Sequence, residues 1–210
     1  SEYPKPILLN DYFSDVNDLI EIKDHKINLK YKKNDLILKG LGKVKFEKDF
    51  SNVEYIISNK KNILNINSRI DLNELKLKNK KFLKPFFPKL KETIDLKDQK
   101  IEIDYSKNNF SIKGLGQIKF DEEFENINFI ISKIDNKFNF DTQIDLEKTS
   151  FIIDFLNFKK NEKSKKKLII KGNHNNQNKL NFTEILIKEN NNKINFENLL
   201  LDDDNLIIKI

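Results

Sequence analysis

Apolar and polar residues alternate along most of the chain, and this alternation predicts β-strands. Between residues 26 and 72, apolar side chains occupy every second position in short runs, which are separated by polar turn residues such as Lys33-Asn34-Asp35. A period of two places successive side chains on opposite faces of a strand, so one face would be buried and the other wet. Short polar turns between such runs are typical of antiparallel sheet. We therefore predict a mainly β protein.

The strand pattern occurs twice. The segment 26–72 aligns without gaps on the segment 100–146, and Gly40-Leu41-Gly42 falls on Gly114-Leu115-Gly116, an offset of 114 − 40 = 74 residues. An internal repeat predicts structural units that stack on one another. The segments Asn10–Ile20 and Lys84–Ile94, which precede each copy, are expected to form short helices or loops.

The repeat predicts the organisation of the chain. After residue 150 the pattern no longer follows the 74-residue offset, although four further strand-like runs occur. The predicted units are a lead-in over 1–7, a first β repeat over 8–81, a second over 82–155 and a variant β unit over 156–210. Because the chain does not start with Met and ends in an apolar run, we expect it to be part of a longer protein in which the variant unit continues.

The apolar face of the predicted sheet must be covered by protein or by another apolar partner. The chain holds about 14 strand-like runs, and open sheets seldom exceed about 10 strands without curling or closing. No amphipathic helix long enough to cover such a sheet is evident. The sheet could close on itself as a sandwich or barrel. We predict instead a long antiparallel sheet that is curved into a U shape and leaves a groove.

The candidate functional residues are the apolar series that would line this groove. The series takes the inward position of each strand in both copies. These residues are Leu36, Leu38, Val44, Phe46, Val53, Tyr55, Ile57, Leu64 and Ile66 in the first copy, and Phe110, Ile112, Ile118, Phe120, Ile127, Phe129, Ile131, Phe138 and Phe140 in the second.

Composition and charge exclude several functions. The chain has 38% hydrophobic residues, a formal net charge of +6 and no cysteine, which excludes disulfides and thiolate sites. Lysine alternates with acidic residues along most of the chain, so no large face of a single sign is expected. The aromatic residues alternate inward and are not interleaved with basic residues, which argues against nucleic acid as a partner. No run approaches the roughly 20 apolar residues of a membrane span.

Chemistry-bearing motifs are weak. The two Gly-Leu-Gly motifs precede strand-like residues, whereas a phosphate loop needs a helix there, so we expect them to allow a bend or bulge between strands. His25 and His174 are about 150 positions apart and are expected at the surface. The Lys-rich run 163–167 is expected to be solvated. Carboxylates fall on the predicted wet face, so no acid–base pair in a cleft is indicated. We predict no enzyme activity, no metal site and no cofactor.

Three stretches of the second copy and its continuation resemble the AsmA-like proteins, especially the YhdP-type branch. They are Asp98 to Tyr105, Lys113 to Phe120 and Ile127 to Ser132, and the segment Phe151 to Ile210 is also similar. The resemblance covers nearly the whole chain, although loops of the family are richer in Gly, Ala and Pro.

The resemblance implies a function without catalysis. It implies a periplasmic protein of the Gram-negative envelope, anchored to the inner membrane by a segment outside this chain, whose groove carries phospholipid between the inner and outer membranes. Sheltering one acyl methylene from water gains about 0.8 kcal/mol, so an unbroken apolar lining would be sufficient. Two alternatives stay open: a structural β-repeat spacer whose core is filled by its own side chains, and a closed barrel for a small ligand.

Overall fold

The computed structural model describes most of the chain. The described residues are 2–4, 19–33, 35–45, 49–78, 87, 89–107, 109–134, 137–153, 157–160, 164–174, 180–201 and 207–209.

The mainly β prediction is confirmed. Among the described residues, thirteen strands form one antiparallel sheet in which neighbours follow chain order, from β1 to β9 and then from β12 to β15. A separate two-stranded sheet, β10–β11, is inserted between β9 and β12. The strands are β1 (Glu2–Pro4), β2 (Leu19–Lys32), β3 (Asp35–Lys45), β4 (Phe50–Lys60), β5 (Ile63–Lys78), β6 (Thr93–Ser106), β7 (Asn109–Lys119), β8 (Phe124–Ile134), β9 (Lys137–Leu146), β10 (Phe151–Ile153), β11 (Phe158–Lys160), β12 (Lys166–His174), β13 (Leu180–Glu189), β14 (Asn192–Leu201) and β15 (Ile207–Lys209).

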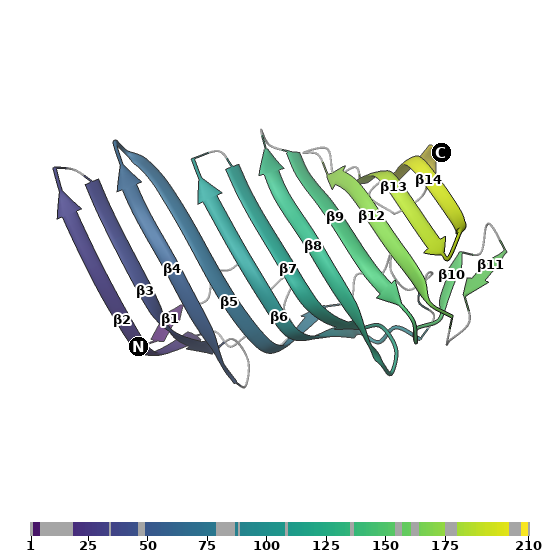
Figure 1. Cartoon of the computed structure of the whole chain (residues 1–210), viewed down its shortest axis with the longest axis horizontal. Helices are drawn as coiled ribbons and strands as arrows, with labels where there is room; N and C mark the ends of the chain where they lie inside the picture. The colour runs from purple at the N-terminus through teal and green to yellow at the C-terminus, as the bar shows by residue number, and fades with distance from the viewer. Residues whose placement is uncertain are drawn as a thin grey trace.

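The sheet is open and curved. Figure 1 shows the long strands side by side, with β2 near one edge and β14 near the other. The long strands curve near the end that lies at the bottom of the view, which we call the bent end. The first and last strands do not pair with each other, so the closed barrel is excluded. Curling is the expected response of a sheet with this many strands.

The pairing register places the two residue series on opposite faces. Cross-strand partners share a face of a sheet. Ile57 of β4 pairs with Leu38 of β3 on one side and with Ile66 of β5 on the other, whereas the next residue, Ser58, pairs with Ile37 and Asn65. We call the side with Ile57 the apolar face and the side with Ser58 the polar face.

Bulges keep the apolar face continuous where the strands bend. In β6 the register shifts between Lys97 and Lys100, and Asp98 has a φ of 49°. The additional residue brings Leu96 and Ile101, which are five positions apart, onto the same face. β2 has a corresponding shift between Lys23 and Lys26. These shifts lie 74 positions apart, although the division of the whole chain into tandem units stays a prediction.

Of the two alternatives expected over Lys84–Ile94, the helix is wrong for the described residues, which form a loop and the start of a strand. The Leu90 N–H donates to the Phe87 carbonyl oxygen at 3.0 Å in a turn, and β6 begins at Thr93. Ile94 pairs with Leu77 of β5, so strand pairing takes the residues that a last helical turn would need. Residues 10–18 of the other expected helix lie outside the described residues, and Leu19 and Ile20 belong to β2.

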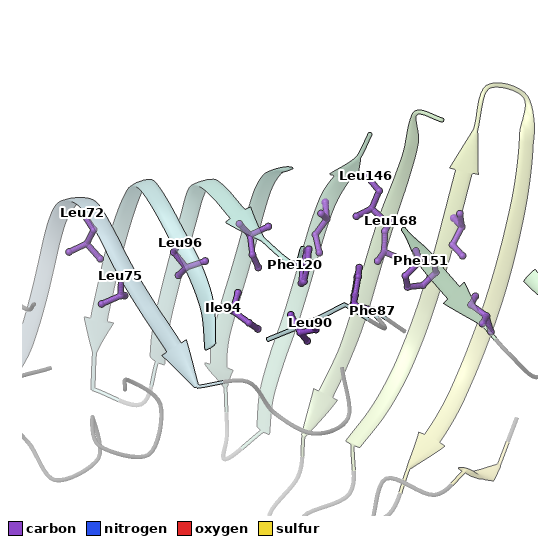
Figure 2. Packing of buried hydrophobic residues seen from close by; sticks show 14 residues of the cluster. Leu72, Leu75, Phe87, Leu90, Ile94, Leu96, Phe120, Leu146, Phe151 and Leu168 are labelled. Carbon is purple, nitrogen blue, oxygen red and sulfur yellow. The ribbon is translucent and has the colours of Figure 1, made fainter. Parts of the chain in front are cut away.

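The hydrophobic core lies on the apolar face at the bent end of the strands. Figure 2 shows Leu72, Leu75, Leu96 and other core side chains on the inner side of the bent strands. Segments that connect the long strands cover this part of the face. They contribute Phe87 and Leu90 from the connection between β5 and β6, and Phe151 and Ile153 from β10.

Candidate functional site

The structure brings the predicted lining residues together on the apolar face. Strand pairing places these described members of the series on that face: Leu36, Leu38, Val44, Val53, Tyr55, Ile57, Leu64, Ile66, Phe110, Ile112, Ile118, Ile127, Phe129, Ile131, Phe138 and Phe140. Phe120 follows the last residue of β7 and packs in the core on that face. Phe46 lies outside the described residues. The face itself follows from the sequence alternation, but its exposure differs between the two ends of the strands.

One part of the apolar face is filled by the protein itself. The Phe120 ring, which is 4% exposed, stacks on the Phe87 ring with 4.1 Å between centroids and 5° between planes. Phe87 also contacts Phe151 at 5.2 Å between centroids. Ile118 is buried in the same cluster. Ile118 and Phe120 therefore belong to a packed core, and no ligand can reach them in this structure.

The other part of the apolar face is accessible to solvent. It lies at the opposite end of the strands, where β4 turns into β5 and β8 turns into β9, and we call this end the hairpin end. Ile131 of β8 and Leu64 of β5 are 36% and 40% exposed, and Phe138 of β9 has a similar exposure. Ile131 and Phe138 belong to the β8–β9 hairpin and Leu64 to the β4–β5 hairpin, and Tyr105 of β6, which lies between them on the same face, is 37% exposed. We call this region the open apolar face. Exposed apolar residues that share one face make this region the candidate binding surface.

The candidate series omitted the most exposed members of this face. Ile27 and Leu29 of β2 are 59% and 61% exposed, and Tyr31 is more exposed still. They pair with Gly40, Leu38 and Leu36 of β3 and so lie on the apolar face. Their signal in the sequence was the same period-two alternation. The covering residues Phe87 and Phe151 had no such signal, because they lie outside the alternating runs.

Aromatic side chains cross over glycines on the open apolar face. The Tyr55 ring of β4 lies against Gly40 of β3, and the Phe129 ring of β8 lies against Gly114 of β7. These glycines sit within regular strands without positive φ. The bulges expected at the glycines lie instead in the neighbouring strands β2 and β6. At Gly40 and Gly114 glycine is required because a side chain would overlap the aromatic ring, not because the strand bends there.

Substitution of Gly114 tests this close contact. We expect Gly114→Ala to lower the free energy of unfolding by about 1 kcal/mol, because the new methyl group overlaps the Phe129 ring. In a Phe129→Ala background the same substitution should be neutral or slightly stabilising, since alanine loses less chain entropy on folding. Urea unfolding of the four variants measures the coupling. Equal effects of Gly114→Ala in both backgrounds would contradict the contact.

The polar face is held by ion pairs between directly opposed residues. Arg69 of β5 contacts Glu102 of β6 at 3.1 Å, and Lys45 of β3 contacts Glu21 of β2 at 2.8 Å. Such pairs at the surface contribute about 0–1 kcal/mol each and favour the observed register. The Glu184 carboxylate accepts a hydrogen bond from Lys171 and raises the pKa of the Lys171 ammonium.

Other sequence motifs supply no catalytic arrangement. In the run 163–167, Lys165 pairs with Glu147, Lys166 with Glu189 and Lys167 with Asp145, so these three charges are used within the protein. His25, expected at the surface, is half-buried and packs edge-on against Tyr55 at 6.0 Å between centroids.

The polar face also carries a shallow hollow of about 810 Å³. Its lining includes Lys26, Lys39, Glu54, Arg69 and Glu102, a set of mixed charge. Within the described ranges, no group of three or more His, Asp or Glu side chains is placed to hold a metal ion. In that same part of the chain, none of the elements is a helix that could span a membrane.

Comparison with known proteins does not place the chain in a family, since no family model, no curated protein and no solved structure matches it.

Proposed function

We propose that the open apolar face binds the acyl chains of phospholipids, in a protein that carries out no catalysis. The observation that supports this proposal is the exposure of Leu64, Ile131 and Phe138 on the same face as a packed core. The packed part provides a stable base, and the accessible part offers apolar surface that water solvates poorly. Binding of hydrocarbon to that surface is favourable by about 25 cal/mol per Å².

The geometry of the sheet suits a long hydrocarbon chain. The strands β2 to β9 are consecutive neighbours in one sheet, and at about 4.8 Å between strands they extend over roughly 35 Å. The polar face, with its ion pairs, stays in water, and the headgroup of a bound lipid can stay in water at the rim of the apolar face. This arrangement agrees with what the resemblance to AsmA-like proteins implies, namely carriage of phospholipid in the bacterial envelope, which stays part of the proposal.

A pair of adjacent isoleucines gives a matched test. Ile131 lies on the apolar face and pairs with Ile112 and Phe140, whereas Ile130 lies on the polar face and pairs with Lys113 and Asp141. Their exposures are 36% and 44%, so only the face differs. We expect Ile131→Asp to weaken lipid binding about tenfold. The substitution removes the burial of about two methylene groups against the lipid, at about 0.8 kcal/mol each, and a tenfold change in affinity corresponds to about 1.4 kcal/mol. Ile130→Asp should leave binding unchanged.

The measurement uses the whole chain and vesicles of phosphatidylethanolamine and phosphatidylglycerol that contain a tail-labelled phospholipid. After incubation and removal of the vesicles by flotation, the labelled lipid that stays with the protein is quantified. A benzophenone photocrosslinker at position 131 should capture lipid, and the same crosslinker at position 130 should not. Equal capture at the two positions, or no capture at position 131, would contradict the proposal.

The packed part of the apolar face supports a second function, that of a structural spacer. The cluster around Phe87 and Phe120 shows that the protein can fill its own apolar face where connecting segments reach it. A spacer predicts that both isoleucine variants retain the same small amount of lipid. The same vesicle experiment therefore separates the two functions.

A further inference from the structure

Two hollows lie on the polar face, and the proposed binding of acyl chains uses neither of them. The hollow of about 810 Å³ described above, which we call the first hollow, lies over β2 to β6. A second hollow of about 340 Å³ lies over β6 to β9. Ligand pockets of proteins commonly have volumes of about 300–1,000 Å³. Because β2 to β9 are consecutive neighbours, the two hollows follow one another across the same sheet.

The pairing register places the second hollow on the polar face. Leu115 of β7 pairs with Asn128 of β8, and Asn128 pairs with Gln143 of β9. These three residues line the hollow. The neighbouring residue Phe129 points to the other side, where it lies against Gly114 on the apolar face. The second hollow is therefore separated from the open apolar face by the sheet itself.

Each hollow contains a leucine that is exposed to solvent. Leu41, the central residue of the first Gly-Leu-Gly motif, lines the first hollow and is 50% exposed. Leu115, the central residue of the second motif, lines the second hollow and is 56% exposed. Ile56 adds another exposed apolar side chain to the first hollow. A small apolar area within polar surroundings fits a ligand that carries both C–H surface and hydrogen-bonding groups.

The groups around these leucines are polar, without a large excess of one charge. Three cations and three carboxylates line the first hollow, and they belong to Lys26, Lys39, Arg69, Glu54, Glu102 and Asp104. The second hollow is lined by four amides and two carboxylates, which belong to Gln117, Asn126, Asn128, Gln143, Asp98 and Asp145. Asp145 also forms an ion pair with Lys167 at 3.7 Å. Both linings therefore offer hydrogen-bond donors together with acceptors.

This lining limits the class of ligand. A strongly charged ligand would meet side chains of its own sign in the first hollow. A hydrocarbon would take water from charged groups and amides without replacing their hydrogen bonds. A peptide strand would find no free main-chain ladder, because β3 to β8 are paired on both sides. A neutral ligand with many hydroxyl groups can donate to the carboxylates and accept from the cations and amides.

We propose that the polar face binds a neutral oligosaccharide, which lies across the strands and occupies both hollows. Its hydroxyl groups exchange hydrogen bonds with the Asn128 and Gln143 amides and with the charged groups of the first hollow. The C–H surfaces of its sugar rings pack on Leu41 and Leu115. The strands of these leucines, β3 and β7, are four spacings apart, or roughly 20 Å, so a chain of several sugars is needed to reach both. This binding is independent of acyl-chain binding to the opposite face.

Two neutral hexasaccharides with a fluorescent end label are the probes, namely cellohexaose and the hexamer of N-acetylglucosamine. The β-1,4-linked hexamer of glucuronic acid is the charged control, because it differs from cellohexaose only in a carboxylate on each sugar. Fluorescence anisotropy with the whole chain measures the affinities. We expect a neutral hexamer to bind at least tenfold more tightly than the glucuronate hexamer. Its affinity should not change with salt concentration, since the ligand carries no charge.

Asn128→Leu and Asn139→Leu form a matched pair of variants. Both asparagines lie on the polar face, but Asn128 lines the second hollow, whereas Asn139 pairs with Ser132 and Asn173 and lines neither hollow. Leucine has a similar size and lacks the amide. We expect Asn128→Leu to weaken binding of the neutral hexamer about fivefold to tenfold and Asn139→Leu to leave it unchanged. Circular dichroism verifies that both variants fold.

Side-chain amide signals in the NMR spectrum provide a second measurement. The signals of Asn128 and Gln143 should shift when the neutral hexamer is added, and that of Asn139 should not. The proposal is overturned if neither neutral hexamer binds at millimolar concentration, or if the glucuronate hexamer binds equally or more tightly. Equal weakening by Asn128→Leu and Asn139→Leu would also overturn it.

Discussion

Replacement of Phe120 by alanine is expected to lower the free energy of unfolding by about 3–5 kcal/mol. The Phe120 ring is buried and stacks on Phe87, which in turn contacts Phe151 of β10. Removal of the ring leaves a cavity at the point where two connecting segments meet the sheet. Because the surrounding strands are fixed by main-chain hydrogen bonds, we expect the cavity to collapse only partly. Urea denaturation followed by circular dichroism measures the loss.

Leu115→Ala is the matched control for Phe120→Ala. Leu115 lies in β7, five residues before Phe120, and its side chain is 56% exposed on the polar face. We expect its replacement to change the free energy of unfolding by less than about 0.5 kcal/mol. Equal losses for the two variants would show that the segment around Phe87 does not pack on the sheet in solution.

The second large effect is expected from Glu125→Ala. Glu125 of β8 is 4% exposed, and its carboxylate accepts hydrogen bonds from the backbone N–H groups of Glu147, Lys148 and Thr149 at 2.6–3.1 Å. From the other side, the buried Lys160 ammonium donates to the carbonyl oxygens of Glu147 and Thr149. The turn that leads from β9 to β10 is therefore held through both its donors and its acceptors.

Alanine at position 125 leaves buried N–H groups without acceptors, and we expect a loss of about 3 kcal/mol in the free energy of unfolding. Glu125→Gln, which retains one acceptor oxygen, should lose less. Glu123→Ala is the control, since Glu123 is exposed and forms a surface ion pair with Lys148 at 3.5 Å, and its effect should stay below about 0.5 kcal/mol. If the Glu125 and Glu123 variants unfold at the same urea concentration, the turn does not depend on this carboxylate.

These two sites decide how much of the apolar face is accessible. Phe87, Phe151 and the turn held by Glu125 cover the bent end of the sheet and leave the hairpin ends uncovered. A sheet whose apolar face was covered along its whole length would leave no surface for a lipid. A sheet whose apolar face was wholly uncovered would expose a large apolar patch that favours aggregation. The arrangement of a packed base and an open apolar face is the physical basis of the proposed lipid binding.

Period-two alternation by itself determined the fold class and the membership of the apolar face. Tyr55 and Phe129, for example, lie on the predicted face because one slip of register would move every side chain of a strand to the other side. The polar turns determined the order of the strands in the same direct way, since each strand from β1 to β9 and from β12 to β15 pairs with the next along the chain; the pairing of β9 with β12 across the inserted β10–β11 did not follow from them. Where the alternation was interrupted, as at Lys84–Ile94, the sequence left a helix and a loop open. The described residues form a turn that leads into β6, because Thr93 and Ile94 pair with β5.

Only the tertiary structure decided which part of the apolar face is covered. Phe120 and Ile131 have the same character in the alternating pattern, yet one is buried under Phe87 and the other is accessible. The difference arises from connecting segments that fold back across the bent end of the sheet, and the reach of such a segment depends on the curvature of the whole sheet. Curvature is a property of many strands and their bulges together, so no local pattern of residues records it.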